Sequence, residues 1–210
     1  DTPSVNDCLD TPAMDQLANE GVRFNQAYVN APSCGPSRAA VATGCYFWRA
    51  GRSAMMGTPG NWEGVEDPRQ KLPGFGKLLQ NEGYHTGRTY KTLSTLWFPG
   101  KIYQANGKKF CAYSQTVEAA PSLEEGHEMI KQEVIANFQD FLKDREEGQP
   151  FCYVWGPHNS HRPWNKGSGK NIWGIEPDDL KGEMPRHLPD IPLIREDFAD
   201  YLGEVQAFDK

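Results

Sequence analysis

The chain has 210 residues, of which 38% are hydrophobic, 11% aromatic and 24% charged, and these proportions exclude a disordered or fibrous protein. Its net charge of -6 argues against nucleic acid as the main partner, because binding to phosphate backbones needs a surplus of Lys and Arg. The sequence has no apolar run long enough for a membrane span, so we expect none.

The first half of the chain alternates predicted helices with predicted strands. Residues 11–21 predict a helix, because Pro12 falls in its first turn and Gly21 ends it. Residues 22–28 then predict a strand. Residues 36–44 and 76–82 predict two more helices, and residues 84–88 predict a strand.

The second half continues this alternation. Apolar residues recur at helical spacing over 122–147, and the apolar run 151–155 predicts a buried strand. Residues 167–192 are rich in Gly, Pro and charge and predict a long surface excursion, after which 196–208 predict a helix. Alternating elements of this kind predict an α/β fold with a mostly parallel sheet, whose ligand sites lie at the carboxyl ends of strands.

The five cysteines are scattered and form no C-x-x-C pair, so the sequence favours neither a zinc ribbon nor a dense disulfide framework. Cys34 stands out because it lies at a predicted helix start, where unpaired N–H groups and the helix dipole favour an anion. Arg38 follows one turn later with a fixed positive charge. For an arbitrary cysteine and arginine, the better interpretation is that Cys34 is a small buried residue and Arg38 a surface residue of the helix.

The string from Cys34 to Gly44 matches C-x-P-x-R-x-x-x-x-T-G, the signature of type I sulfatases, and the chain resembles that family. The spacing differs from the C-x-x-x-x-x-R loop of tyrosine phosphatases. Residues 11–24 resemble the T-P-N-x-D-x-L-A-x-x-G-x-x-F stretch that precedes the signature. The resemblance extends over nearly the whole chain.

Two later segments carry further parts of this resemblance. Residues 83–87 resemble the stretch before the family's G-K-W-H, which places Lys91 on the sulfate-binding lysine. Residues 158–163 resemble H-x-P-H-x-P, which places His161 on an active-site histidine. The chain departs from the family at Leu93, where the family has a second histidine, so protonation of the leaving group is expected to depend on His161.

The closest likeness is to bacterial enzymes similar to N-sulfoglucosamine sulfohydrolase, the heparan N-sulfatase, through residues 161–169, 188–190 and 197–209. The resemblance implies an alkaline phosphatase-like α/β/α sandwich. Residues 1–210 would form the incomplete N-terminal part of its catalytic domain, with 167–192 as the surface excursion. The paired aspartates of the family's first strand are not seen before Thr11.

The chemistry that the resemblance implies uses Cys34 as formylglycine, hydrated to a geminal diol. The diol at Cys34 would bind one calcium ion whose other ligands lie outside this fragment. Arg38 would hold the diol, while Lys91 and His161 would bind sulfate oxygens and a protonated His161 would serve as the acid. The expected substrate-binding residues are His158, Asn159, Arg162 and Lys101.

We therefore expect a hydrolase that removes sulfate from a sulfated sugar or glycosaminoglycan, matured by a formylglycine-generating or sulfatase-maturing enzyme. The resemblance implies a periplasmic or secreted protein, with a lysosomal setting as the alternative. A phosphonate or phosphate ester hydrolase and a non-catalytic protein that binds sulfated glycans are the competing functions. His158 and His161 form an H-x-x-H pair, but without a third ligand this pattern is more typical of hydrogen bonding than of zinc.

Overall fold

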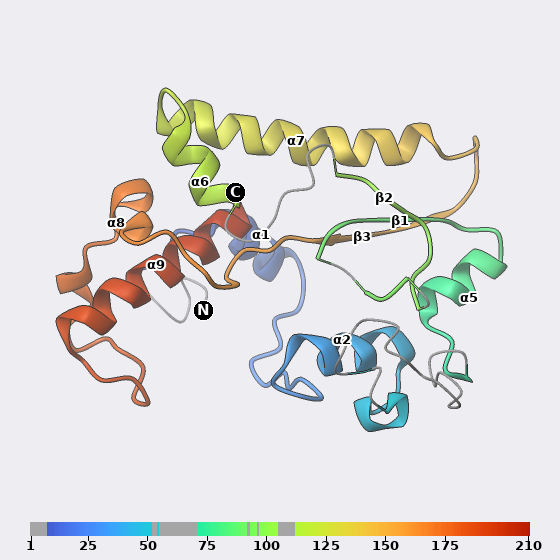
Figure 1. Ribbon diagram of the computed structural model, residues 1–210, viewed down its shortest axis with the longest axis horizontal. Helices are drawn as coiled ribbons and strands as arrows, with labels where there is room; N and C mark the ends of the chain where they lie inside the picture. Colours follow the sequence, from blue (N-terminus) through green and yellow to red (C-terminus); the bar gives the residue numbers. More distant parts are fainter. Residues whose placement is uncertain (1–7, 52–53, 55–70, 92, 96, 105–111) are drawn as a thin grey trace, which may run out of the picture. The chain divides into compact units, whose positions relative to one another are not determined.

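The computed structural model describes residues 8–51, 54, 71–91, 93–95, 97–104 and 112–210 (Figure 1). Contacts divide the chain into two compact units. Unit 1 comprises the segments Asp1–Phe24, Asn106–Ala136 and Pro157–Lys210. Unit 2 comprises Asn25–Ala105 and Asn137–Gly156.

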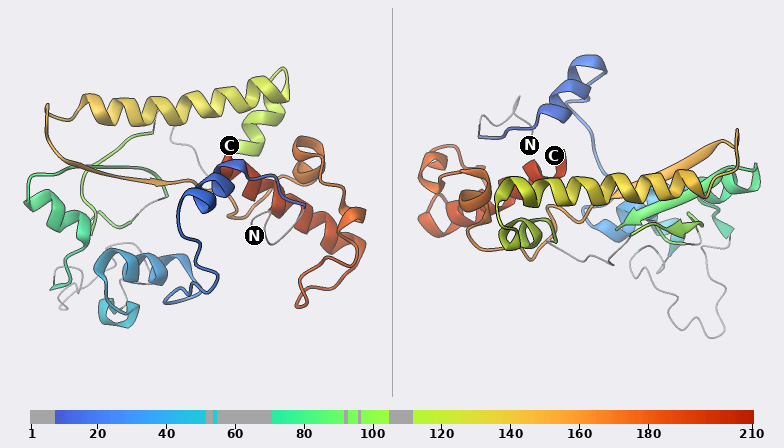
Figure 2. Two further views of the ribbon diagram at one scale, coloured as in Figure 1. Left: turned by 180° about the vertical axis from the view of Figure 1, so that it is seen from behind. Right: turned by 90° about the horizontal axis from the view of Figure 1, so that it is seen from above.

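Unit 2 contains a parallel sheet in the order β2-β1-β3, which confirms the predicted sheet type. Its strands are β1 (His85–Tyr90), β2 (Lys101–Ile102) and β3 (Phe151–Gly156). The register runs from His85 opposite Phe151 to Tyr90 opposite Gly156, and Figure 2 shows the strands side by side in both views. Parallel strands end at the same edge, so the residues after β1 and β3 leave the sheet together.

One face of the sheet packs against the end of helix α7 (Leu123–Lys143). Phe141 has no solvent exposure, and its ring stacks with that of His85, meets that of Tyr103 edge-on and is tilted against that of Tyr153. Gly87 leaves room for this ring, because a Cβ there would lie 2.4 Å from a Phe141 carbon. The close approach of helix and sheet therefore requires a glycine at this position.

The opposite face packs against a second apolar cluster. Alternate residues of a strand point to opposite faces, and Cys152 and Val154 of β3 contact this cluster. It is built from helix α2 (Cys34–Thr43), the 3-10 helix η1 (Phe47–Ala50), helix α5 (Phe75–Asn81) and the chain after β1. Its buried members are Ala39, Ala42, Ala50, Ala54, Leu93, Trp97 and Phe98. Helices on both faces make unit 2 an α/β/α arrangement, as expected for an alkaline phosphatase-like fold.

Unit 1 is helical and packs around its last helix, α9 (Pro192–Asp209). The other elements are α1 (Pro12–Glu20), α6 (Ala112–Ala119), the first part of α7, α8 (Ser168–Trp173) and the 3-10 helix η2 (Pro177–Leu180). Helices α8 and α9 approach closely, because a Cβ on Gly169 would lie 2.1 Å from the carbonyl oxygen of Ala199. Buried residues from α6, α8, η2 and α9 form two apolar clusters, one with Leu180 and Leu202 and the other with Ile172.

Most of the predicted helices are confirmed, with shifted ends. Helix α2 begins at Cys34, and α9 begins at Pro192, whose ring suits the first helical turn. Helix α7 ends at Lys143, short of the predicted 147. Helix α6 and strand β2 were not predicted. None of the helices within the described ranges combines the length and apolar character needed to span a bilayer.

Three sequence expectations differ from the structure. Residues 22–28 form irregular chain, because they pair with no strand among the described residues and their apolar side chains are exposed. Strand β3 is not buried: it lies at an edge of the described sheet, which leaves Phe151 42% and Trp155 40% exposed. The segment 167–192 contributes α8 and η2 to the core, so part of it is not a surface excursion.

We predict that Phe141→Ala lowers the free energy of unfolding by about 3–5 kcal/mol, because it leaves a cavity between α7 and the sheet. Met129→Ala on the same helix is the matched control, since Met129 is 56% exposed and should cost under about 0.5 kcal/mol. Urea denaturation of both variants measures the difference. Equal losses would contradict the packing of Phe141 described above.

Candidate active site

Helix α2 begins with Cys34, whose side chain is exposed. Ser33 precedes it in an extended conformation and gives the helix no side-chain cap, while its carbonyl oxygen accepts from the Ser37 amide at 3.0 Å. The first N–H groups of a helix have no partner within the helix, so this end favours a negative group. Gly44 ends the helix in the left-handed conformation. The helix start predicted at Cys34 is thus confirmed, and its binding of an anion stays a prediction.

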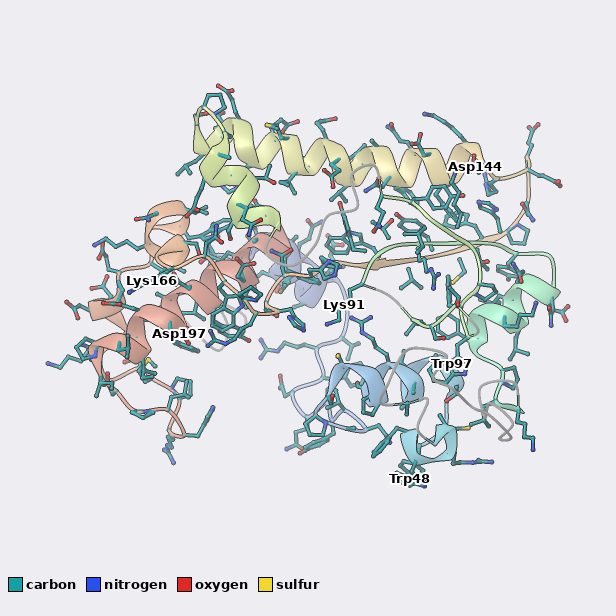
Figure 3. All side chains as sticks on the ribbon, in the orientation of Figure 1. Trp48, Lys91, Trp97, Asp144, Lys166 and Asp197 are labelled. Atoms are coloured by element: carbon teal, nitrogen blue, oxygen red, sulfur yellow. The ribbon has the colours of Figure 1, made fainter. Side chains whose placement is uncertain are left out.

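Arg38 links this helix to the chain that follows strand β1. Its Nη1 donates to the carbonyl oxygen of Lys91 at 2.9 Å, across 53 positions of sequence. The amide of Lys91 in turn donates to the carbonyl oxygen of Gly156 at 2.7 Å, at the end of β3. Figure 3 labels Lys91 between the sheet and α2. Unit 2 therefore brings together the beginning of α2 and the carboxyl ends of β1 and β3.

Side chains four apart on a helix lie about 6 Å apart, so Arg38 and Cys34 are neighbours on α2. A guanidinium has five N–H donors, and a bond to one carbonyl oxygen leaves others for an oxyanion. The arrangement combines a helix N-terminus, an exposed Cys34 and an arginine oriented by the backbone of Lys91. Chemically, it can hold a negatively charged group beside position 34.

A buried arginine fixes the chain beyond Lys91. Arg88 of β1 is 3% exposed and its Nη1 donates to the carbonyl oxygens of Leu93 at 2.7 Å and Phe98 at 3.3 Å. Burial lowers the pKa of Arg88 from its usual value. This role of Arg88 was not anticipated, because an arginine within a predicted strand carries no sequence sign of its partners.

Leu93, at the position where the family resemblance expects a histidine, is 7% exposed and packs in the apolar cluster of unit 2. Its side chain has no proton to give. Within unit 2, position 93 therefore contributes packing to the site and no acid.

His161 lies in unit 1, in the turn that follows β3. Its amide donates to the carbonyl oxygen of His158 at 2.9 Å, and Ser160 between them has a positive φ of 62°. Nδ1 of His161 lies 2.5 Å from the carbonyl oxygen of Arg162. Because a carbonyl oxygen only accepts, Nδ1 is the donor in this bond, and the His161 side chain is exposed.

Three of the expected substrate-binding residues are engaged by carboxylates. Arg162 makes a bidentate ion pair with Asp197 of α9, and this interaction raises the pKa of Arg162. Nδ2 of Asn159 donates to Glu204 at 2.9 Å. These contacts give both residues a structural role, and their binding of a substrate stays a prediction, as does that of His158.

Lys101, the third of these residues, pairs with Asp144 just beyond α7, at 2.8 Å (Figure 3). Tyr103 also donates to Asp144, at 2.9 Å, and Nζ of Lys101 lies 4.7 Å from the Tyr103 ring centre. The bond from Lys101, followed by that from Tyr103, lowers the pKa of Asp144. Lys101 therefore ties β2 to the end of α7, and its binding of substrate stays a prediction.

Within the described ranges, no three side chains of His, Cys, Asp or Glu lie together as a metal site would require. These residues by themselves do not fit the expected calcium ion, which needs six to eight oxygen ligands. The H-x-x-H pair of His158 and His161 likewise has no group of ligands around it in this part of the chain.

The profile of the Sulfatase family matches residues 5–169. The chain belongs to the sulfatase family. Nearly four fifths of the sequence lies within this match, including the helix that begins at Cys34, residue Lys91 and the turn that holds His161.

Curated relatives are sulfatases of several kinds. The chain is 31% identical over 165 residues to N-acetylglucosamine-6-O-sulfatase of Bacteroides thetaiotaomicron, which covers 74% of the chain and 27% of that protein. It is 34% identical over 224 residues to the ulvan-active sulfatase of Formosa agariphila, covering 95% and 35% respectively. Human arylsulfatase D shares 43% identity over 84 residues, covering 39% and 14%. The chain thus spans about a third or less of the length of these relatives.

Among solved structures, the crystal structure of Ps i-CgsB matches with a TM-score of 0.54 and 22% identity, over 96% of this chain and 47% of that one. The same protein in complex with k-i-k-neocarrahexaose matches with a TM-score of 0.52 and 23% identity, over 95% and 47%. At this identity the likeness establishes the fold and nothing finer.

We predict that Asp144→Asn destabilises the protein at neutral pH and that the difference from the native protein shrinks as the pH falls. The folded-state pKa of Asp144 is lowered, so its contribution is present above the unfolded pKa and is lost as pH falls through the folded value. Unfolding free energies between about pH 6 and about pH 3 test this. Asp140→Asn, which removes the exposed pair with Lys143, is the control, and a difference independent of pH would contradict the assignment.

Proposed function

We propose that the full protein hydrolyses a sulfate ester or N-sulfate on a sulfated sugar, using a formylglycine made from Cys34. The observation that carries the proposal is the bond from Arg38 to the backbone of Lys91, one helical turn from an exposed Cys34 at the start of α2. Family membership supports the same conclusion, because the matched region contains the Cys34 signature. Aryl, steroid and sugar sulfatases are all relatives.

In the proposed reaction, one hydroxyl of the hydrated aldehyde at position 34 loses its proton to water and its oxygen attacks sulfur, while the bond from sulfur to the leaving oxygen or nitrogen breaks. Protonated His161 gives its proton to the leaving group. The second hydroxyl of the diol then gives its proton to the now neutral His161, its oxygen forms the aldehyde double bond, and the bond between carbon and the sulfate oxygen breaks to release sulfate. Water hydrates the aldehyde again, so each cycle consumes one water.

The side chains have separate tasks in this proposal. Arg38 and the N–H groups at the start of α2 orient the diol and stabilise negative charge as it develops. Lys91 binds a sulfate oxygen. His161 uses Nε2, because Nδ1 donates to the carbonyl oxygen of Arg162. Leu93 is buried in the apolar cluster, so His161 is the acid assigned to the leaving group.

The proposal includes a calcium ion, but the described residues do not form a complete binding site for it. The hydrated aldehyde would add one ligand at position 34, and bound calcium would lower the pKa of the diol. No step above is assigned to the ion. Maturation of Cys34 requires a formylglycine-generating or sulfatase-maturing enzyme, and the family resemblance supports a periplasmic or secreted protein, or alternatively a lysosomal one.

A sulfated carbohydrate is the substrate class that the relatives favour. Two of them are named N-acetylglucosamine-6-O-sulfatase and ulvan-active sulfatase, and a structural neighbour was solved in complex with k-i-k-neocarrahexaose. The likeness to heparan N-sulfatases adds an N-sulfate as a candidate. His158, Asn159, Arg162 and Lys101 are the residues proposed to contact the sugar.

The first test compares the mass of the Cys34 peptide with the release of sulfate by the full-length protein. We expect an aldehyde in place of the thiol in active protein, and no turnover in Cys34→Ala. Cys45→Ala is the control, because Cys45 lies just after the same helix and should not affect turnover. Sulfate release by protein that carries only a thiol at Cys34 would refute the mechanism.

Two other results would favour the competing functions. Faster turnover of an aryl phosphonate than of an aryl sulfate would assign the site to phosphonate esters. Binding of heparin oligosaccharides without sulfate release, by protein with a confirmed aldehyde and added calcium, would assign it to glycan binding alone.

We predict that Arg38→Lys lowers kcat/KM roughly 100-fold to 1000-fold, because an ammonium cannot bond both the Lys91 carbonyl and the diol with a fixed fork. Arg49→Lys is the matched control, since Arg49 is exposed in η1 and its Nη1 lies 3.9 Å from the sulfur of Cys45. Steady-state kinetics of correctly modified proteins make the comparison. Unchanged kcat/KM in Arg38→Lys would exclude Arg38 from the chemistry.

A further inference from the structure

Glu204 is a buried carboxylate in the middle of α9, with an exposed fraction of 1%. Its Oε1 accepts from Oγ of Ser114 on α6 at 2.5 Å, and its Oε2 accepts from Nδ2 of Asn159 at 2.9 Å. Burial raises the pKa of Glu204, while the bonds from Ser114 and Asn159 oppose that rise. A buried charge is costly unless it is hydrogen-bonded, so both oxygens of Glu204 are used to join α9 to other segments.

The Asn159 bond matters because of the turn in which this residue lies. The turn from His158 to His161 is closed by the bond from the His161 amide to the His158 carbonyl oxygen, with Ser160 at a positive φ of 62°. Residues other than glycine rarely adopt this conformation, and it persists only where surrounding contacts determine it. The bond from Asn159 to Glu204 is such a contact, immediately before Ser160.

A second contact fastens the other end of the same turn to the same helix. Arg162, immediately after His161, donates to both oxygens of Asp197 at 2.9 and 2.5 Å, and its guanidinium lies 3.8 Å from the Trp164 ring centre. Asp197 and Glu204 are seven residues apart, which places them on one face of α9 about 10 Å apart along its axis. His161 is thus bracketed by Asn159 and Arg162, each held by a carboxylate of α9.

We propose that Glu204 is a positioning residue, which acts through Asn159 to hold the turn that presents His161 to the sulfate group. Asp197 serves the same turn through Arg162, so α9 is the support on which His161 is oriented. This inference rests on the proposed function, in which His161 binds sulfate and protonates the leaving group. It assigns to Glu204 no contact with the substrate.

The structure offers a matched control for this role, because Glu204 has two partners. Asn159→Ala and Glu204→Ala both remove the link to the turn, whereas Ser114→Ala removes the other bond to the same carboxylate. Glu204→Gln can keep both contacts, since its amide oxygen accepts from Asn159 and its amide nitrogen donates to Ser114. A role limited to stability predicts that the Ser114 and Asn159 variants behave alike.

The test measures kcat and KM of the modified full-length protein, together with Tm. We expect Asn159→Ala and Glu204→Ala to lower kcat up to about 100-fold, since small displacements of a catalytic group cost this much. The variant that combines Asn159→Ala with Glu204→Ala should have a kcat no lower than that of the less active single variant. Glu204→Gln should retain most of the activity. Ser114→Ala should lower Tm and leave kcat unchanged.

A second measurement does not depend on turnover. The imidazole resonance of His161, assigned by its loss in His161→Gln, should shift in Asn159→Ala and Glu204→Ala and stay in place in Ser114→Ala. Additive losses of kcat, an equal loss in Ser114→Ala, or an unmoved His161 resonance in Asn159→Ala would each overturn the proposal. If the native protein releases no sulfate while the resonance shifts as expected, the proposed function fails and the positioning of His161 stands.

Discussion

A hydrogen bond from the guanidinium of Arg38 to the carbonyl oxygen of Lys91 joins the helix that begins at Cys34 to the carboxyl end of strand β1. The bond fixes the direction of Arg38 and leaves donors of the same planar group for a ligand. Because Lys91 is itself bonded to Gly156, the ends of two parallel strands are held at one place beside α2. The site that we propose in unit 2 depends on this convergence.

In both units, a buried charged side chain fixes the chain that follows a strand. Arg88 bonds the carbonyl oxygens of Leu93 and Phe98 beyond β1, and Glu204 bonds Asn159 beyond β3. The cost of burying each charge is offset only when its hydrogen bonds are made. Such residues therefore restrict the loops that carry Lys91 and His161 to conformations that satisfy these hydrogen bonds, as the roles proposed for the two residues require.

The errors of the sequence prediction have a common physical origin, because each depends on contacts with segments that are distant in the sequence. Residues 22–28 have the composition of a strand, yet an extended segment becomes a strand only when neighbouring strands bond its backbone. The apolar run of β3 predicts burial on both faces, but its edge position leaves Phe151 and Trp155 partly exposed. Conversely, residues 167–192 read as a surface excursion, although α8 and η2 contribute the buried residues Ile172 and Leu180 to the apolar clusters around α9.

The amino-acid sequence by itself determined the local structure of the site: the helix start at Cys34, its glycine stop at Gly44, and the alternation that yields a parallel sheet. These features depend on interactions within a few residues, which a linear pattern records. Only the tertiary structure decided that Arg38 bonds Lys91, that Leu93 enters the core, and that Asn159 rests on Glu204, 45 positions away. Partners so distant in the chain are chosen by the packing of helices on the sheet and on one another, and the local sequence carries no record of that choice.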